Sequence, residues 1–256
     1  MQLTLRDSGP ADAPAILFLH ASPLSGRMWL PQFERLTEFY CMAPDLPGHG
    51  GSAAIPLSMP DTVQRLADLI HQKAAGGRAH VVGLSFGGVV AQALMVAAPD
   101  SVDHVILSGT STRLGKTLVA LNGLNGPILR LLSPKQSAGL VGWQFRVPNS
   151  YRASLADDLQ EFSPQAFGAV NMAYSDIETP SATQSPTLVA VAEKETVIAR
   201  RAARQLAQII PGAVTVVVAG MGHLWSLQAP DLFSDTVAAW IGDQPLPKAL
   251  NHLSSY

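Results

Sequence analysis

The stretch AHVVGLSFGGVVAQALMVAA, residues 79–98, constrains the fold more than any other part of the chain. A short β-branched run leads into a glycine-rich segment, and a mostly apolar run then continues to Pro99. This pattern predicts a buried strand, a tight turn and a buried helix. Gly83 and Gly87 have no Cβ atom to obstruct the turn, so we expect Ser85 at its tip with an exposed hydroxyl. Ser85 is therefore a candidate nucleophile.

Further short apolar runs alternate with helical patterns along most of the chain. The expected strands cover residues 15–19, 40–43, 102–107, 187–192 and 214–218, and residues 2–6 are expected to form an edge strand. Strands that alternate with helices in this way are typical of a parallel sheet built from βαβ units. The last residues, 243–256, are expected to form a loosely held tail.

This alternation stops between residues 111 and 185. The segment contains helix-like fragments broken by Gly and Pro but no apolar strand run. We therefore expect an α/β core made of residues 1–110 and 186–256, with residues 111–185 inserted as a helical cap. Segments inserted over a rigid scaffold usually shape its binding site.

The chain is sparingly charged. Only 14% of its 256 residues are charged and the formal net charge is −2, whereas about a quarter of the residues are charged in ordinary domains. This composition has no excess of basic residues, so it does not indicate a nucleic acid or an anionic membrane as partner. The first residues lack the basic and apolar regions of a signal peptide, and we expect a cytoplasmic protein.

The cysteine and histidine content indicates neither an internal disulfide nor a metal centre. Cys41 is the single cysteine, and its apolar strand-like surroundings predict a buried, unreactive thiol. The seven histidines are scattered, without an H-E-x-x-H motif or paired cysteines. We expect no metal and no cofactor.

A serine nucleophile needs a base, a group that orients the base and donors for the developing oxyanion. In parallel sheets such groups lie at the carboxyl ends of the strands. His223 follows the last expected strand and is the candidate base. Glu193 and Glu195 both follow the strand before it, and the residues alone leave the choice of acid open. The histidines that fit the role of base less well are His20, His49, His71, His80, His104 and His252.

Two backbone N–H groups are candidates for the oxyanion hole. Phe86 follows the nucleophile and begins the expected helix, whose dipole favours negative charge. Ser22 lies in the loop after the first parallel strand, where Pro23 has no N–H and Ala21 is too close to the strand end. The side chain of Ser22 could add a hydrogen bond or could serve only to stabilise the turn.

Four motifs now stand in order along the chain: Leu19-His20-Ala21-Ser22-Pro23-Leu24, Asp45-Leu46-Pro47-Gly48-His49-Gly50-Gly51-Ser52, Gly83-Leu84-Ser85-Phe86-Gly87-Gly88 and Gly220-Met221-Gly222-His223. Together they resemble the α/β-hydrolase superfamily, in particular its compact capped bacterial esterases and the plant methylesterase and hydroxynitrile lyase branch. The resemblance implies an α/β-hydrolase fold, with a mostly parallel central sheet, helices on both faces and a small helical cap. It also implies Ser85, Glu195 and His223 as a catalytic triad.

Two positions depart from the family pattern. The family usually has His-Gly where this chain has His20-Ala21, a change that keeps room for the oxyanion loop. It usually has an aspartate in the acid segment, where this chain has Ala192-Glu193-Lys194-Glu195. A glutamate is accepted in this role. Serine at position 85 argues against the dehalogenase and epoxide hydrolase branches, which use an aspartate nucleophile.

The leading hypothesis is a serine hydrolase that cleaves small to medium-sized, uncharged, apolar carboxylic esters through an acyl-enzyme. Trp143 in the expected cap and Leu224 beside the candidate base are expected to contact such a small-molecule substrate. The same triad could instead serve C–C bond hydrolysis, lactone opening, perhydrolysis or cyanohydrin lysis, and a non-catalytic ligand binder is the third alternative. A monomer or a homodimer is expected.

Overall fold

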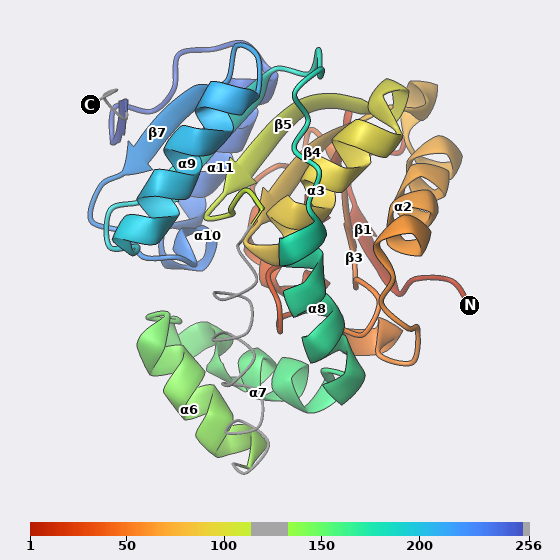
Figure 1. The fold of residues 1–256 in the computed structure, drawn as a ribbon, viewed down its shortest axis with the longest axis vertical. Coiled ribbons are helices and arrows are strands. Elements are labelled where there is room, and N and C mark those ends of the chain that lie inside the picture. The colour runs from red at the N-terminus through yellow and green to blue at the C-terminus, as the bar shows by residue number, and fades with distance from the viewer. Residues whose placement is uncertain (114–132, 253–256) are drawn as a thin grey trace.

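The computed structural model describes residues 1–113 and 133–252, and its centre is one twisted sheet (Figure 1). The strands follow the order β1-β3-β2-β4-β5-β6-β7-β8 across the sheet. They are β1 (Leu5–Ser8), β2 (Ala15–Leu19), β3 (Tyr40–Pro44), β4 (Ala79–Leu84), β5 (Val102–Ser108), β6 (Thr187–Ala192), β7 (Val214–Val218) and β8 (Leu250–His252). Strands β2 to β7 pair in parallel, and β1 and β8 pair antiparallel at the two edges. The prediction of a mostly parallel sheet is therefore confirmed.

Strand β8 corrects the expectation of a loose C-terminal tail. Residues 250–252 pair with β7, and the side chain of Leu250 is buried in the core. An unpaired edge of a sheet presents a row of free N–H and C=O groups that another segment of chain can satisfy. A segment this short carries no strand pattern of its own, so the sequence alone did not indicate the pairing.

Helices cover both faces of the sheet, as expected. One face packs against α2 (Met59–Lys73), α3 (Phe86–Ala97) and α9 (Val197–Ile209), and the other against α1 (Leu30–Phe33), α10 (Trp225–Gln228) and α11 (Pro230–Ile241). The short 3-10 helices are η1 (Gly26–Trp29), η2 (Gly50–Ser52), η3 (Ala75–Gly77), η4 (Pro99–Ser101) and η5 (Asn149–Tyr151). Among the described helices, none is both long and apolar enough to cross a lipid bilayer.

The central strands are mostly apolar because both faces of the sheet are buried there, and β2 is apolar and buried at every position. Val81 of β4 points into the core layer that contains α3, whereas Val82 points into the layer that contains α11. Successive side chains of a strand alternate between the faces, so a strand covered on both sides needs an unbroken apolar run. Cys41 of β3 is buried among these residues, and burial raises the pKa of its thiol to about 12. The prediction that this thiol is buried is confirmed, and its lack of reactivity stays a prediction.

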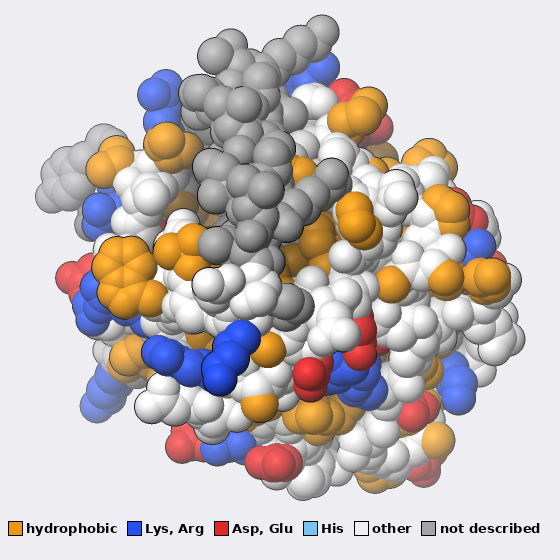
Figure 2. Space-filling view, turned by 90° about the horizontal axis from the view of Figure 1, so that it is seen from below, with side chains coloured by type: hydrophobic (Ala, Val, Ile, Leu, Met, Phe, Trp, Pro, Cys, Tyr) orange, Lys and Arg blue, Asp and Glu red, His pale blue; other side chains and the backbone are white. Residues whose placement is uncertain are grey.

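Three helices of the described residues lie between β5 and β6, within the expected insertion. They are α6 (Pro134–Gln144), α7 (Arg152–Glu161) and α8 (Pro164–Asp176), and they lie together at one end of the sheet (Figure 1). Residues 114–132, which belong to the same expected cap, lie outside the described residues. Seen from the cap end, charged side chains are scattered among hydrophobic and uncharged ones (Figure 2). The exact division between core and cap stays a prediction.

A buried carboxylate joins α7 to the segment between β2 and β3. Asp158 of α7 accepts hydrogen bonds from Ser25 Oγ at 2.6 Å, from Tyr151 Oη at 2.8 Å and from Arg27 Nη1 at 2.9 Å. Arg27 also contacts both carboxylate oxygens of Glu161. Because Ser25 and Arg27 lie between β2 and β3 and the carboxylates lie on α7, this network fixes the position of α7 relative to the sheet.

Candidate active site

Ser85 occupies the turn between β4 and α3 with a backbone conformation that is rare for residues other than glycine. Its φ is 56° and its ψ is −115°, a strained combination that persists only where surrounding contacts impose it. The N–H of Ser85 donates to Ser108 O at 2.9 Å, which ties the turn to the end of β5. A Cβ atom on Gly87 would lie 2.0 Å from Leu19 O, so the following helix can approach β2 only with glycine there. The half-buried Ser85 side chain therefore sits at the carboxyl end of the sheet, as predicted.

His223 and Glu195 meet at the same end of the sheet. His223 follows β7, Glu195 follows β6, and His223 Nδ1 lies 3.0 Å from Glu195 Oε2. An ionised carboxylate only accepts hydrogen bonds, so Nδ1 carries the proton and Nε2 of the neutral ring has a free lone pair. The other carboxylate oxygen, Oε1, accepts the N–H of Ala192 at 3.2 Å. A ring held in this way has the tautomer that a general base requires.

The second candidate acid lies elsewhere. Glu193 is exposed, and its Oε2 accepts the backbone N–H of Gly220 at 2.6 Å. Of the two carboxylates that the residues left open, the structure brings Glu195 to the histidine. The turn after β6 decides this, because it directs Glu195 inward and Glu193 towards the backbone of the next loop.

Gly109 lies directly against the histidine pair. It follows β5 with a φ of 54°, and a Cβ atom there would lie 2.9 Å from Cε1 and Nδ1 of His223 and 3.1 Å from Glu195 Oε1. The preceding residue, Ser108, is the one whose carbonyl holds Ser85. Residues 108 and 109 therefore touch both halves of the candidate triad. In the described part of the chain, no hydrogen bond joins the side chains of Ser85 and His223.

The two predicted oxyanion donors have no partners within the described segments. The N–H of Phe86 is the first of α3, and the N–H of Ser22 lies in the loop after β2; neither donates a hydrogen bond to another described residue. The first N–H groups of a helix have no intrahelical acceptor and favour an anion. The side chain of Ser22, whose role was open, contacts His49 Nε2 at 2.9 Å.

The sequence pattern of the Alpha/beta hydrolase family matches residues 16–236. The chain belongs to this family. A protein of Gibberella zeae described as an AB hydrolase superfamily protein is 31% identical over 243 residues, which cover 91% of this chain and 82% of that protein. Carboxylesterase YbfK of Bacillus subtilis is 25% identical over 258 residues, with the same two coverages of 91% and 82%.

A solved structure supports the fold of this α/β hydrolase. A thermophilic esterase from Thermogutta terrifontis superposes with a TM-score of 0.75 and covers 94% of this chain and 93% of its own. Its sequence identity is 24%, so the likeness concerns the fold alone.

Helix α8 of this α/β hydrolase brings a residue to the site that sequence reasoning missed. Tyr174 of α8 packs its ring 6.3 Å from the ring of Phe86, and its hydroxyl lies near the side chain of Ser85. Burial raises the pKa of Tyr174 to about 12, so the phenol stays neutral in ordinary buffers. The cap sequence has no motif around this tyrosine that could have singled it out.

The structure does not bring the two predicted substrate-contacting residues to the site. Trp143, near the end of α6, is 77% exposed, because the helix turns its ring to solvent. Phe145, just beyond the helix, instead places its ring 5.5 Å from that of His223. Leu224 is 3% exposed and packs into the core beneath α10. A cavity of about 300 Å³ lies beside His223 and is lined by Gln144, Phe145, Arg146, Lys194, Glu195, Thr196, Gly222 and His223.

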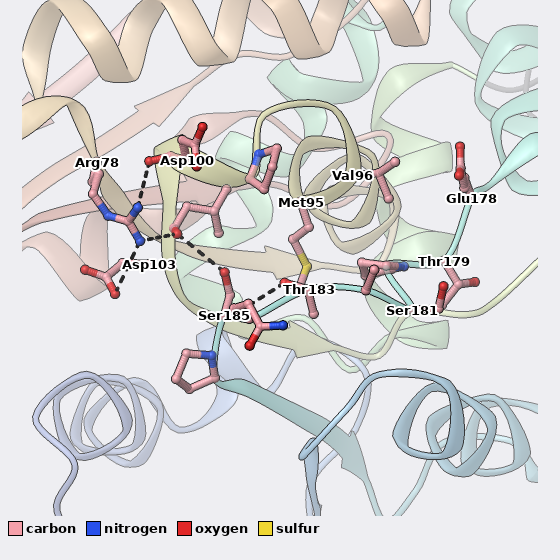
Figure 3. A pocket seen from close by; sticks show the side chains of 16 residues that line it. Arg78, Met95, Val96, Asp100, Asp103, Glu178, Thr179, Ser181, Thr183 and Ser185 are labelled. Carbon is pink, nitrogen blue, oxygen red and sulfur yellow. Dashed lines mark hydrogen bonds and ion pairs between the residues drawn. The ribbon is translucent and has the colours of Figure 1, made fainter.

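The amino ends of the strands carry a separate group of polar residues. A cavity of about 380 Å³ opens there, beside Arg78, Asp103 and Ser185 (Figure 3). Nearby, His80, Asp103 and His104 place potential metal-ligand atoms within 4.8 Å of one another. The scattered histidines of the sequence gave no sign of this grouping, which arises because β4 and β5 are neighbours. His80 Nδ1 already accepts the N–H of His104 at 3.3 Å.

Proposed function

We propose that this chain is a serine hydrolase that cleaves small to medium-sized carboxylic esters through an acyl-enzyme. The observation that carries the proposal is the hydrogen-bonded pair of His223 and Glu195, packed against Gly109 beside the strained turn of Ser85. The similarity to a protein named as a carboxylesterase agrees with this reaction class.

The proposed reaction gives each of these groups a role. Ser85 Oγ attacks the ester carbonyl carbon while His223 Nε2 takes its proton, and Glu195 stabilises the imidazolium through Nδ1–H. The carbonyl oxygen becomes an oxyanion, which accepts hydrogen bonds from the N–H groups of Phe86 and Ser22. Collapse of this intermediate expels the alcohol, which leaves with the proton from His223. Water then attacks the acyl carbon by the same route in reverse, and the acid and free Ser85 are released.

The surroundings of the site favour an uncharged, apolar group on the substrate. The rings of Phe145, Phe162 and Tyr174 lie next to those of His223, His49 and Phe86, respectively. Binding sites for small molecules are mostly apolar with a few polar groups that fix orientation. A panel of aryl esters with short, medium, long and anionic acyl groups tests this preference, because an optimum on an anionic ester would contradict it.

The nucleophile is tested by fluorophosphonate labelling. Ser85→Ala is expected to lose the serine adduct and to lower kcat/KM for an aryl ester by about 10⁴- to 10⁶-fold. Ser185→Ala, at the other end of the sheet, is the matched control and should be labelled like the wild type. Labelling of folded Ser85→Ala, or a folded wild type that takes up no label, would overturn the proposal and favour a non-catalytic ligand binder.

The same residues are compatible with C–C bond hydrolysis, lactone opening, perhydrolysis and cyanohydrin lysis. One substrate of each kind, assayed at the enzyme concentration used for the esters, separates these reactions from ester cleavage. Turnover of one of them together with no turnover of any ester would replace the proposed reaction while keeping Ser85 as the nucleophile.

A further inference from the structure

His49 is completely buried in the loop between β3 and η2, and its hydrogen bonds define its protonation. Nδ1 lies 2.9 Å from Pro47 O, and Nε2 lies 2.9 Å from Ser22 Oγ. A carbonyl oxygen only accepts, so the proton of the neutral ring is on Nδ1. Nε2 is then an acceptor, and the hydroxyl of Ser22 must donate to it. The hydrogen bond therefore has a defined direction, from Ser22 to His49.

The ring of His49 also contacts Phe86, the other residue expected to donate to the oxyanion. It stacks on Phe86 with a centroid distance of 5.8 Å and an interplanar angle of 21°. On another side it meets the ring of Phe162, at the end of α7, at 4.8 Å. One buried side chain thus contacts Ser22, Phe86 and the cap together.

The environment keeps His49 neutral. Burial, together with the neighbouring His20, lowers the pKa of His49 to about 3. His20 faces it with a centroid distance of 5.0 Å and is itself neutral, because burial lowers its pKa to about 4. The charged group that acts on His49 is the carboxylate of Asp45. The acceptor Nε2 is therefore present across the pH range in which such a hydrolase would work.

We infer that His49 is a positioning residue of the oxyanion hole, which holds Ser22 so that its backbone N–H points, with that of Phe86, at the developing oxyanion. The inference rests on the proposed function. An oxyanion donor is effective only within about 2.7–3.1 Å of the oxygen, and a displacement of about 1 Å can cost two orders of magnitude in rate. A ring anchored to Ser22 and Phe86 controls the spacing of both donors.

The hydrogen bonds also exclude His49 as an alternative base for Ser85. Pro47 O occupies its Nδ1 and Ser22 Oγ occupies its Nε2, so neither ring nitrogen is free to take a proton from Ser85. The effect of His49 on the reaction must therefore pass through the residues that it contacts. This distinction makes the role of His49 separable from that of His223 by experiment.

Two single variants and their combination test the inference. His49→Phe keeps an aromatic ring beside Phe86 but removes the acceptor, and Ser22→Ala removes the donor but keeps the backbone N–H. Each is expected to lower kcat for an aryl ester by about 10- to 100-fold with little change in KM, because the oxyanion forms only after the substrate binds. The double variant should be no slower than the slower single variant, since both changes break one hydrogen bond.

Conservative rescue and a distant control sharpen the test. His49→Gln offers an amide oxygen that can accept from Ser22, and it should recover most of the lost kcat. His71→Phe changes an exposed histidine on α2 and should leave kcat unchanged. Affinity for a trifluoromethyl ketone, which forms a tetrahedral adduct, should fall in parallel with kcat in His49→Phe and Ser22→Ala.

Several outcomes would overturn the inference without touching the proposed function. An unchanged kcat in Ser22→Ala or in folded His49→Phe, or fully additive losses in the double variant, would show that His49 does not act through Ser22. Ser22→Ala decides the question even where His49→Phe does not fold. If the wild type is not labelled by a fluorophosphonate, the proposed function fails instead.

Discussion

Both ends of the strands carry a histidine next to a carboxylate, but the two pairs have different neighbours. At the carboxyl ends, His223 and Glu195 lie 3.0 Å apart and pack against Gly109, beside the turn of Ser85. At the amino ends, His104 Nδ1 and Asp103 Oδ1 lie 3.4 Å apart, and their further contacts include Asp243, Arg78 and His80. The groups next to a histidine–carboxylate pair thus decide whether the pair can serve a reaction. In parallel α/β sheets, ligands bind at the carboxyl ends of the strands.

Replacing each histidine with glutamine tests most directly whether the two histidine–carboxylate pairs differ in their roles. His223→Gln should lower kcat/KM for an aryl ester by about 10⁴- to 10⁶-fold, because the proton acceptor of Ser85 is lost. His104→Gln should leave kcat/KM within about twofold of the wild type, since its ring lies at the other end of the strands. Steady-state kinetics of the purified variants measures both. Comparable losses in the two variants would mean that the carboxyl-end pair has no special role.

The two glutamates that follow β6 are expected to give the next largest difference in kcat. Glu195→Gln keeps the size of the side chain but cannot stabilise the imidazolium, and we expect kcat to fall by about 10³- to 10⁴-fold. Glu193→Gln is the matched control, two residues away, and only its contact with Gly220 N changes. If Glu193→Gln caused the larger loss of kcat, the assignment of the acid would have to be reversed.

Two glycines, one beside the histidine pair and one far from it, separate effects on activity from effects on stability. Gly109 and Gly212 have φ values of 54° and 68°, but an added Cβ atom meets the histidine pair only at Gly109 and finds nothing within 4 Å at Gly212. Gly109→Ala and Gly212→Ala should each cost about 1–2 kcal/mol of folding free energy. Only Gly109→Ala should also lower kcat, by about 10- to 100-fold, because it displaces the ring of His223. Thermal unfolding and kinetics on the same samples separate the two effects, and equal activity in both variants would contradict this prediction.

The local pattern was sufficient to predict the elements that hold the nucleophile. The spacing of Gly83, Ser85 and Gly87 between two apolar runs indicates the turn, and the order of the strands places His223 at the same end of the sheet. These predictions succeed because short-range steric rules and the parallel-sheet rule apply to any chain of this pattern.

Contacts between distant loops were not predictable in the same way. The hydrogen bond between Ser22 and His49 depends on how two loops pack, and neither loop has a regular pattern. Trp143 was expected at the site because it lies in the expected cap, but the direction of a side chain at a helix end depends on the packing of that helix. Tyr174 reaches Ser85 only because α8 crosses the end of the sheet.

Buried histidines give an expected effect on stability rather than on rate. Burial lowers the pKa of His20 from 6.5 to about 4, with its Nε2 accepting the N–H of Leu46. The unfolded chain takes up a proton below pH 6.5 while the folded chain does not, so the free energy of unfolding falls as the pH decreases from about 6.5 to 4. His20 alone accounts for a decrease of about 3 kcal/mol over this interval.

Urea unfolding at both ends of this pH interval measures the effect. His20→Asn is expected to be less stable at neutral pH but to lose less stability on acidification than the wild type, because its side chain takes up no proton in the unfolded chain. His71→Asn, at an exposed position on α2, should keep the pH dependence of the wild type. Direct titration of the imidazole signals by NMR provides a second measurement if His20→Asn does not fold. A His20 ring that is protonated at pH 6 in the folded protein would contradict the prediction.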